Sequence, residues 1–257
     1  MNFTRIGAIA ANTVREALRH KVLYVLLAFG LVLICSGALL SSLSYVERER
    51  ILQDIGLGSL RLFGAAIAIF VGVGLIHREV DRRTIFTILS KPVARTEFLL
   101  GKFAGLTATL WMQAAIMAAT FGVVSLFLGA PLGWGHLAAV LLAALEFSVL
   151  VAVATLFSSF TTPLLASLFT AGFYLVGHLT RDLRELGIAT KSEQAQRITD
   201  TLYMVVPDLE RFNVSTEAVH GLPISAEQVG LAFLLACLYC TITLGLASLA
   251  FERRDFR

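Results

Sequence analysis

Residues 137–157 read LAAVLLAALEFSVLVAVATLF, an apolar run interrupted by a single charged side chain, Glu146. A transmembrane helix needs roughly 20 apolar residues to cross the hydrocarbon core of a bilayer. Backbone groups in lipid must be satisfied within the protein, and this run lacks the alternating pattern of barrel strands. The stretch therefore predicts a membrane-spanning α-helix that carries one carboxylate.

Five further apolar runs lie along the chain. The six predicted spans cover residues 22–44, 59–76, 103–128, 137–157, 164–179 and 229–251. The residue types AVILMFWYC make up 57% of the chain and charged residues only 15%, with a mean hydropathy of +0.79. Soluble domains carry roughly 25% charged residues. We therefore expect an all-α, polytopic membrane protein in which residues 1–257 form a single transmembrane domain.

The distribution of basic residues predicts the orientation of these spans. With six spans both termini lie on one side, and if that side is the cytoplasm, the inner loops and tails are residues 1–21, 77–102, 158–163 and 252–257. These segments hold 13 of the 21 Lys and Arg residues. Loops rich in Lys and Arg stay in the cytoplasm. We therefore expect both termini to be cytoplasmic.

Two segments outside the spans have helical patterns of their own. Residues 4–20 place apolar side chains on one face, which is typical of an amphipathic helix at the membrane interface. In the outer segment, residues 180–228, the capping pattern TKSE at 190–193 predicts a short helix on the membrane surface that ends before Pro207. A second capping pattern, SAEQ at 225–228, predicts the start of the sixth span.

The cytoplasmic loop between the second and third spans, residues 77–102, reads HREVDRRTIFTILSKPVARTEFLLGK. Pro92 disfavours a helical conformation at Lys91 and suits the first turn of a following helix. Before this break, the apolar residues at 85–89 form a face that is too short to cross a membrane. That face must be buried either against the spans or against a partner protein.

This loop resembles the region after the second span of ABC-2 type permeases. That family typically has an acidic residue, a Thr a few positions on, an apolar stretch ending in Leu-Ser/Thr-Lys-Pro, then Arg, Glu and Gly-Lys. The matching residues are Glu79, Thr84, Leu89, Ser90, Lys91, Pro92, Arg95, Glu97, Gly101 and Lys102. Arg83 departs from the pattern, because many members have Gly there. The resemblance extends over the amphipathic first helix, the six-span layout and the final FERRDF at 251–256.

The resemblance implies the permease subunit of an ABC exporter in the bacterial inner membrane. Such a subunit has no catalytic residue and no cofactor of its own; two copies of a separate cytoplasmic ATPase bind ATP and Mg. A coupling helix between spans 2 and 3 would sit in a cleft on that ATPase. Membrane lipids are the other expected contact, and no nucleic acid is expected. The residues assigned to coupling are Glu79, Arg82, Arg83, Thr84, Ile85, Phe86, Leu89, Lys91, Pro92, Arg95, Glu97 and Lys102. The alternative is that the charges of this loop only set the topology.

Glu146 is the one carboxylate deep inside a predicted span. A charge at this depth costs on the order of 3 kcal/mol on insertion scales, so the group should be protonated, paired or facing a wet cavity. One interpretation is a substrate or proton site. The other is a hydrogen bond to a polar group on a neighbouring helix, such as Gln113. Arg61 lies near the outer end of the second span, where we expect its side chain to snorkel to the surface.

The family resemblance also implies two permeases per transporter, either two copies of this chain or one copy with a sister permease. Transmembrane helices approach closely where small residues lie. The candidate interface residues are Gly64, Ala68, Gly72, Gly172 and Phe173. The alternative is that these residues pack spans within one protomer.

Two other functions remain open. One is a non-transporting scaffold that recruits a cytoplasmic ATPase, and the other is an intramembrane lipid-modifying enzyme. The enzyme would need a nucleophile–base pair or a metal-binding acidic motif, and Glu146 alone is neither. The sequence has no Walker A loop and no His-Glu-x-x-His motif, and we predict no metal site. The five histidines do not converge in sequence and are interpreted as interfacial side chains.

Overall fold

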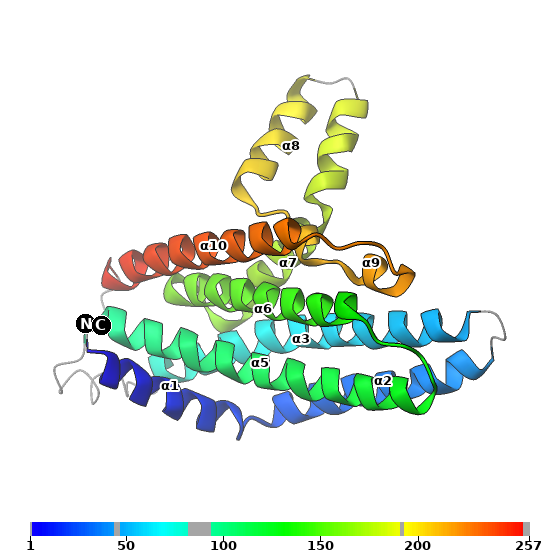
Figure 1. The fold of residues 1–257 in the computed structure, drawn as a ribbon. Coiled ribbons are helices and arrows are strands. Elements are labelled where there is room, and N and C mark those ends of the chain that lie inside the picture. Colours follow the sequence, from blue (N-terminus) through cyan, green and yellow to red (C-terminus); the bar gives the residue numbers. More distant parts are fainter. Residues whose placement is uncertain (1, 44–46, 82–93, 191–192, 254–257) are drawn as a thin grey trace.

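The computed structural model describes residues 2–43, 47–81, 94–190 and 193–253, which form helices and connecting turns without strands. The helices in chain order are α1 (Phe3–Ala17), α2 (Lys21–Ser42), α3 (Arg48–Asp81), α5 (Arg95–Phe127), α6 (Trp134–Phe160), α7 (Pro163–Ala189), α8 (Glu193–Val205), η1 (Leu209–Phe212), α9 (Ser215–His220) and α10 (Ala226–Arg253). Figure 1 shows the long helices side by side in one bundle. The all-helical prediction is confirmed for these residues.

Six of these helices are long and apolar enough to cross a membrane, namely α2, α3, α5, α6, α7 and α10. They correspond one by one to the six predicted spans. The second and fifth spans are longer than predicted, because α3 begins at Arg48 and α7 continues to Ala189. The first turn of α1 and the last turns of α10 lie at the same end of the bundle (Figure 1), as an even number of spans requires.

Helix α6 lies at the centre of the bundle and contacts α3, α5, α7 and α10. Its sequence explains this position, since it is apolar all round and rich in small residues, and a helix of that kind is buried on every side. The side chains of Phe147, Leu150 and Val151 are at most 1% exposed. By contrast, α2, α7 and α10 present large apolar side chains outward, including Phe29, Leu168 and Leu238. A side chain in the middle of α6 is therefore surrounded by protein.

The amphipathic α1 packs lengthwise along the first half of α5. A Cβ atom added at Gly101 would lie 2.7 Å from Cβ of Ile9, and one added at Gly105 would lie 2.6 Å from the backbone oxygen of Ala10. Thr13 is fully buried in this contact region. The apolar face that we expected at the membrane interface is thus covered at least in part by α5. Glycine is required at both positions because the two backbones approach so closely.

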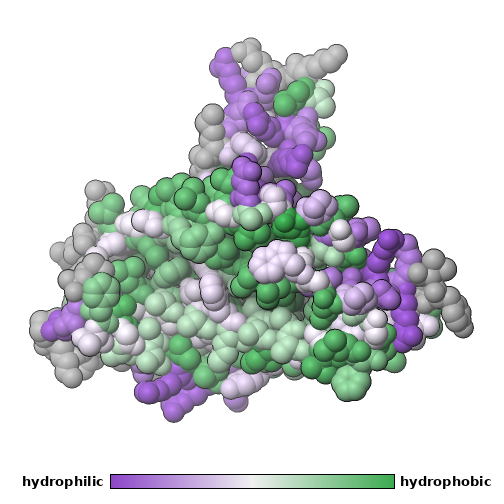
Figure 2. Space-filling model, in the orientation of Figure 1, coloured by the Kyte–Doolittle hydropathy of each residue, from purple (hydrophilic) through white to green (hydrophobic). Residues whose placement is uncertain are grey.

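The segment at residues 180–228 contains the predicted short helix, α8, which ends at Val205 before Pro207. It does not lie along the bundle. Together with the C-terminal half of α7 it forms a helical hairpin that projects from the bundle (Figure 1), held by an ion pair of 3.0 Å between Arg184 and Asp200. Figure 2 shows hydrophilic side chains on this projection and mainly apolar ones on the bundle. The predicted cap of α10 is confirmed, because Ser225 and Gln228 each accept a hydrogen bond from the other's backbone N–H at 3.1 Å.

Candidate functional site

Glu146 and Arg61 form an ion pair inside the bundle. Glu146 lies near the middle of α6 and is 1% exposed, and its Oε2 lies 3.1 Å from Nη2 of Arg61 on α3. The side chain of Arg61 is only 12% exposed. The prediction that Arg61 snorkels to the outer surface is therefore wrong. Its guanidinium turns inward because α6 presents a buried carboxylate at the same level.

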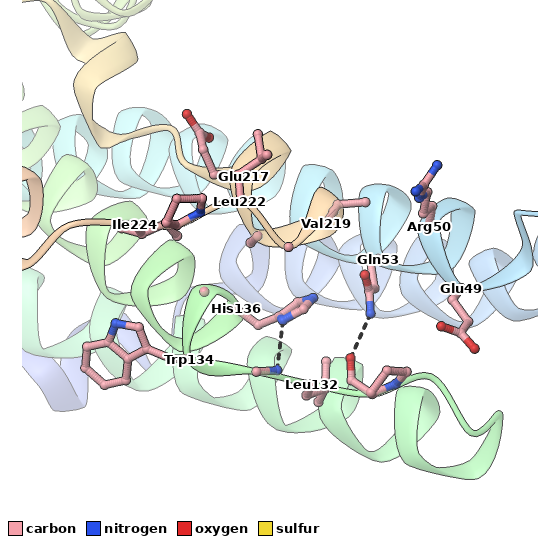
Figure 3. Close-up of a pocket in the computed structure, with 16 residues that line it drawn as sticks. Glu49, Arg50, Gln53, Leu132, Trp134, His136, Glu217, Val219, Leu222 and Ile224 are labelled. Carbon is pink, nitrogen blue, oxygen red and sulfur yellow. Dashed lines mark hydrogen bonds between the residues drawn. The ribbon is translucent and has the colours of Figure 1, made fainter.

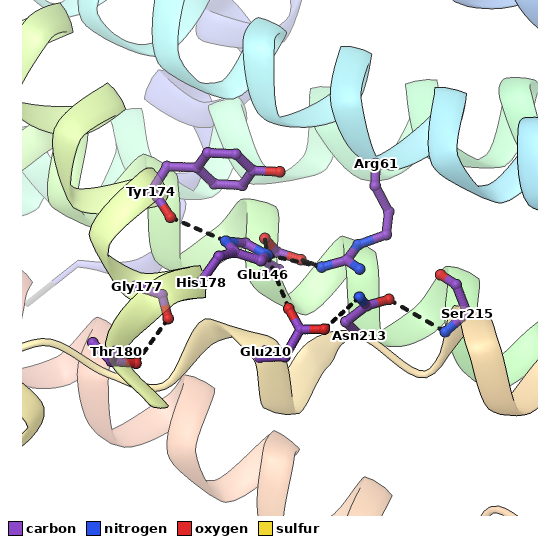
Figure 4. A network of polar contacts seen from close by, with 9 residues as sticks. All are labelled: Arg61, Glu146, Tyr174, Gly177, His178, Thr180, Glu210, Asn213 and Ser215. Carbon is purple, nitrogen blue, oxygen red and sulfur yellow. Dashed lines mark hydrogen bonds and ion pairs between the residues drawn. The ribbon is translucent and has the colours of Figure 1, made fainter. Parts of the chain in front are cut away.

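His178 on α7 joins this pair. Its Nε2 lies 2.9 Å from Nη2 of Arg61 and 3.3 Å from Oε1 of Glu146. Its Nδ1 lies 3.0 Å from the carbonyl oxygen of Tyr174, one turn earlier on the same helix (Figure 4). A carbonyl can only accept, so Nδ1 carries the proton, and in the neutral imidazole Nε2 accepts the hydrogen bond from Arg61.

Glu210 in η1 extends the network toward solvent. Its Oε2 lies 4.0 Å from Nε2 of His178, and its Oε1 accepts a hydrogen bond of 2.7 Å from Nδ2 of Asn213 (Figure 4). The side chain of Glu210 is 45% exposed. It lines a cavity of about 260 Å³ together with Arg181, Asn213 and other residues of η1, α9 and α10. The polar cluster, defined as Arg61, Glu146, His178 and Glu210, thus reaches from the buried centre of α6 to an open cavity.

The alternative partner proposed for Glu146, Gln113, is wrong. Gln113 lies on α5 and is 3% exposed, and neither of its side-chain amide atoms has a hydrogen-bond partner among the described residues. Glu146 instead faces α3 and α7. Trp111 on α5 makes a polar contact with α6, because its Nε1 donates to Oγ of Ser148 at 2.9 Å.

Sequence reasoning missed the cluster as a unit. A usable signal was present, because Arg61 and Glu146 are lone opposite charges in two predicted spans. Each would be costly alone in lipid, and pairing lowers that cost. His178 and Glu210 carry no such signal. In the sequence they are an interfacial histidine and a loop residue, and only the fold shows that they lie close together. In the described part of the chain, no group of three His, Cys, Asp or Glu side chains is arranged to hold a metal ion.

A second set of polar contacts joins α1 to α5 at the opposite end of the bundle from α9. Glu97 accepts a hydrogen bond of 2.8 Å from the backbone N–H of Asn2 and lies 4.0 Å from Arg5. Nζ of Lys102 lies 3.0 Å from Oε2 of Glu16, and the Lys102 side chain is only 2% exposed. Both Glu97 and Lys102 were assigned to ATPase coupling. The structure places them in the contact between α1 and the start of α5.

Residues 7–256 match the family model described as ABC-2 family transporter protein. The chain belongs to the ABC-2 transporter family. The match covers nearly the whole chain and includes the polar cluster and the contact between Lys102 and Glu16. Among curated proteins, no match was found. This ABC-2 protein is therefore a multi-pass membrane component of a transporter, with six candidate spans.

Most of the predicted coupling residues of this ABC-2 protein lie outside the described residues. They are Arg82, Arg83, Thr84, Ile85, Phe86, Leu89, Lys91 and Pro92. Glu79 belongs to the last turn of α3, and Arg95 is the first residue of α5. The coupling segment thus lies between α3, which carries Arg61, and α5, which contacts α1.

The small residues considered for a dimer interface divide into two groups. Gly64, Ala68 and Gly72 pack inside the protomer: a Cβ atom added at Gly64 would lie 2.1 Å from Cζ of Phe147, Ala68 is fully buried, and a Cβ added at Gly72 would meet Ala154 on α6 at 3.6 Å. These three support the alternative of packing within one protomer. On α7, a Cβ added at Gly172 would meet nothing within 4 Å, whereas Phe173 packs partly against the core.

A larger cavity, of about 610 Å³, lies near the end of the bundle formed by the α5–α6 connection and α9 (Figure 3). Its walls combine apolar side chains such as Trp134 and Ile224 with polar ones such as Gln53. Two hydrogen bonds shape it: Nε2 of Gln53 donates to the carbonyl oxygen of Pro131 at 3.0 Å, and the backbone N–H of Gly133 donates to Nδ1 of His136 at 3.1 Å. The sequence carried no signal for this cavity because its residues come from three separate segments.

Proposed function

We propose that this chain is the membrane-spanning permease subunit of an ABC exporter, driven by a separate cytoplasmic ATPase that binds the segment between α3 and α5. The observation that carries the proposal is the match of residues 7–256 to the ABC-2 family, together with six candidate spans. The resemblance of residues 77–102 to the coupling region of such permeases supports it. In this proposal the first residues of α1, the coupling segment and the end of α10 face the cytoplasm.

The helices on either side of the coupling segment suit a mechanical role. Helix α3 runs over 34 residues from the coupling segment past Arg61. Helix α5 begins directly after the segment, and its residues Glu97 and Lys102 hold α1. A helix is a stiff element, so a displacement of the coupling segment would be passed to both α3 and α5. We propose that Glu97 and Lys102 act as positioning residues that make α1 and the start of α5 move together.

The test is co-purification of the full chain with ABC ATPases from its own cells. Replacing Ile85 and Phe86 with Asp should leave insertion and folding intact and reduce ATPase recovery at least tenfold. The matched control is Ile198→Asp on α8, an exposed apolar residue of the projecting hairpin, which should leave recovery unchanged. Normal recovery with the double Asp variant would mean that the segment is not the docking site.

Transport itself needs a separate measurement. Cells with the ATPase and the intact chain should release a compound that cells lacking the chain retain, and reconstituted proteoliposomes should turn over ATP. ATPase capture without any ATP-dependent release would support the scaffold alternative. Failure of the wild-type chain to capture an ATPase would overturn the proposed function.

A further inference from the structure

The polar cluster does not balance its own charge while His178 is neutral. It contains two carboxylates, Glu146 and Glu210, and one guanidinium, Arg61. Arg61 keeps its charge at all ordinary pH values. Glu210 is partly solvated, but Glu146 is enclosed, and an unbalanced charge near a buried site is costly. The addition of one proton brings the four side chains to neutrality.

His178 is the group best placed to accept that proton. Its Nδ1 is already committed to the carbonyl oxygen of Tyr174, so the free position is the lone pair on Nε2. That atom faces a donor, Arg61 Nη2 at 2.9 Å, and two acceptors, Glu146 Oε1 at 3.3 Å and Glu210 Oε2 at 4.0 Å. Neutral Nε2 can accept only from Arg61. Protonated Nε2 can donate only to one of the carboxylates.

We infer that the polar cluster is a proton-binding site in which His178 exchanges Arg61 for a carboxylate partner when it takes up a proton. The proton comes from solvent and adds to the lone pair of Nε2, which turns the imidazole into an imidazolium ion. Arg61 loses its hydrogen bond to His178 and retains its ion pair with Glu146. The new Nε2–H group donates to Glu146 or Glu210 instead, and no other covalent bond is made or broken. The inference rests on the geometry of the cluster and is independent of which substrate the transporter carries.

The groups facing His178 come from every element that meets it. They are Arg61 from α3, Glu146 from α6, Glu210 from η1 and the ring of Tyr174 on α7, whose centroid lies 4.5 Å from that of His178. The charges on α3 and η1 are opposite in sign, so they favour opposite states of the imidazole. Imidazole is the side chain that ordinarily changes charge between pH 5 and 8.

Glu210 links His178 to a cavity. Its side chain is 45% exposed and lines the cavity of about 260 Å³, while its Oε2 is 4.0 Å from Nε2 of His178. A proton arriving in that cavity therefore has a carboxylate beside the imidazole, whose own side chain is 19% exposed. The side chain of Glu146 is only 1% exposed, so it serves as the buried partner and not as the point of access.

This change of hydrogen-bond partner alters which helices the side chain of His178 connects. With His178 neutral, its side chain links α7 to α3 through Arg61; with His178 charged, it links α7 to α6 or to η1. Helix α7 also carries the projecting hairpin. Proton uptake thus biases the position of α7 relative to α3, the helix that leads to the proposed coupling segment.

The first test reads the imidazole directly. The full-length chain, with ring-¹⁵N-labelled histidine, is studied by NMR in lipid nanodiscs, and His178→Gln identifies the His178 signals. We expect the tautomer protonated at Nδ1 at pH 8 and the doubly protonated ring at pH 5. His220 is the matched internal control, because its Nδ1 makes the same contact with a carbonyl oxygen four residues earlier, at 3.0 Å from Thr216, on an exposed side chain. A ring protonated at Nε2 at pH 8, or one still neutral at pH 5, would overturn the inference.

The second test addresses Glu210. At the pH where half of wild-type His178 carries both protons, Glu210→Gln should lower that fraction by about twofold or more, because it removes a carboxylate that favours the charged ring. Glu217→Gln is the control, since Glu217 lines the same cavity. An unchanged fraction in Glu210→Gln, or an equal decrease in Glu217→Gln, would contradict a specific link between Glu210 and His178.

Discussion

The guanidinium of Arg61 donates to the carboxylate of Glu146 across 3.1 Å, joining α3 to α6 where both side chains are enclosed by the bundle. Their side chains are only 12% and 1% exposed. The pair therefore helps to determine which face of α3 packs against which face of α6. It also links the helix before the proposed coupling segment to the central helix of the bundle.

Replacing Glu146 with Leu should destabilise the fold by about 3 kcal/mol, because it leaves the Arg61 charge buried without its partner. Glu146→Gln keeps an acceptor for Arg61 and should cost much less. The double variant Arg61→Met with Glu146→Leu should recover most of the loss, since it removes both charges. Thermal unfolding of the purified chain in nanodiscs measures the series. Glu185→Leu removes one member of an exposed pair and serves as the control.

The contact between Lys102 and Glu16 gives a second prediction. Glu16→Gln leaves the Lys102 ammonium, 2% exposed, beside a neutral amide and should cost about 1–3 kcal/mol. Adding Lys102→Met removes that buried charge and should restore stability in the same unfolding measurement. Equal stability of Glu16→Gln and the wild type would mean that this ion pair does not hold α1.

Close backbone approach between α1 and α5 gives a third prediction. Gly105→Leu should push the two helices apart, because a Cβ there would lie 2.6 Å from a backbone oxygen. In a variant without the native cysteines, Thr13→Cys should then react with a maleimide at least tenfold faster. The control is Gly122→Leu on the same helix, where an added Cβ meets only Leu132 at 3.8 Å. Equal labelling in both backgrounds would place α1 elsewhere.

The small residues of α3 and α7 should respond differently to an added methyl group. Gly64→Ala should destabilise the protomer by about 1–3 kcal/mol, because the added Cβ would overlap the ring of Phe147, which is 1% exposed. Gly172→Ala should be neutral or slightly stabilising, as in an open helix position. If Gly172 lies in a dimer interface, Gly172→Leu should reduce cross-linking between two copies and leave protomer stability unchanged. Intact cross-linking would remove Gly172 from the interface.

Reporter fusions test the proposed orientation. Fusions within residues 1–20, 78–100 and 252–257 should report a cytoplasmic location, and fusions within 182–225 an external one. The reason is the excess of Lys and Arg in the first three segments. An external signal from a fusion at Arg257 would rule out the six-span topology.

The sequence alone was sufficient to identify the spans, the cap of α10 and the end of α8. These features depend on local properties: apolar length for a span, a Ser-x-x-Gln pattern for a cap and a proline for a helix end. The family could also be inferred from the sequence, since the motif from Glu79 to Lys102 is contiguous. The helix limits were less accurate, because α3 and α7 continue beyond their apolar runs into polar sequence.

Tertiary structure decided which side chains meet. Glu146 was recognised as unusual, but its partners Arg61 and His178 are 85 and 32 positions away, and packing of three helices selects them over Gln113. Glu97 and Lys102 were predicted to be coupling residues, and the fold places both in the contact between α1 and α5. The physical reason is that hydropathy along the chain specifies whether a helix is buried, whereas the rotation of each helix about its own axis specifies what its polar residues contact. That rotation is determined by the close packing of small residues such as Gly64, Gly101 and Gly105 against their neighbours.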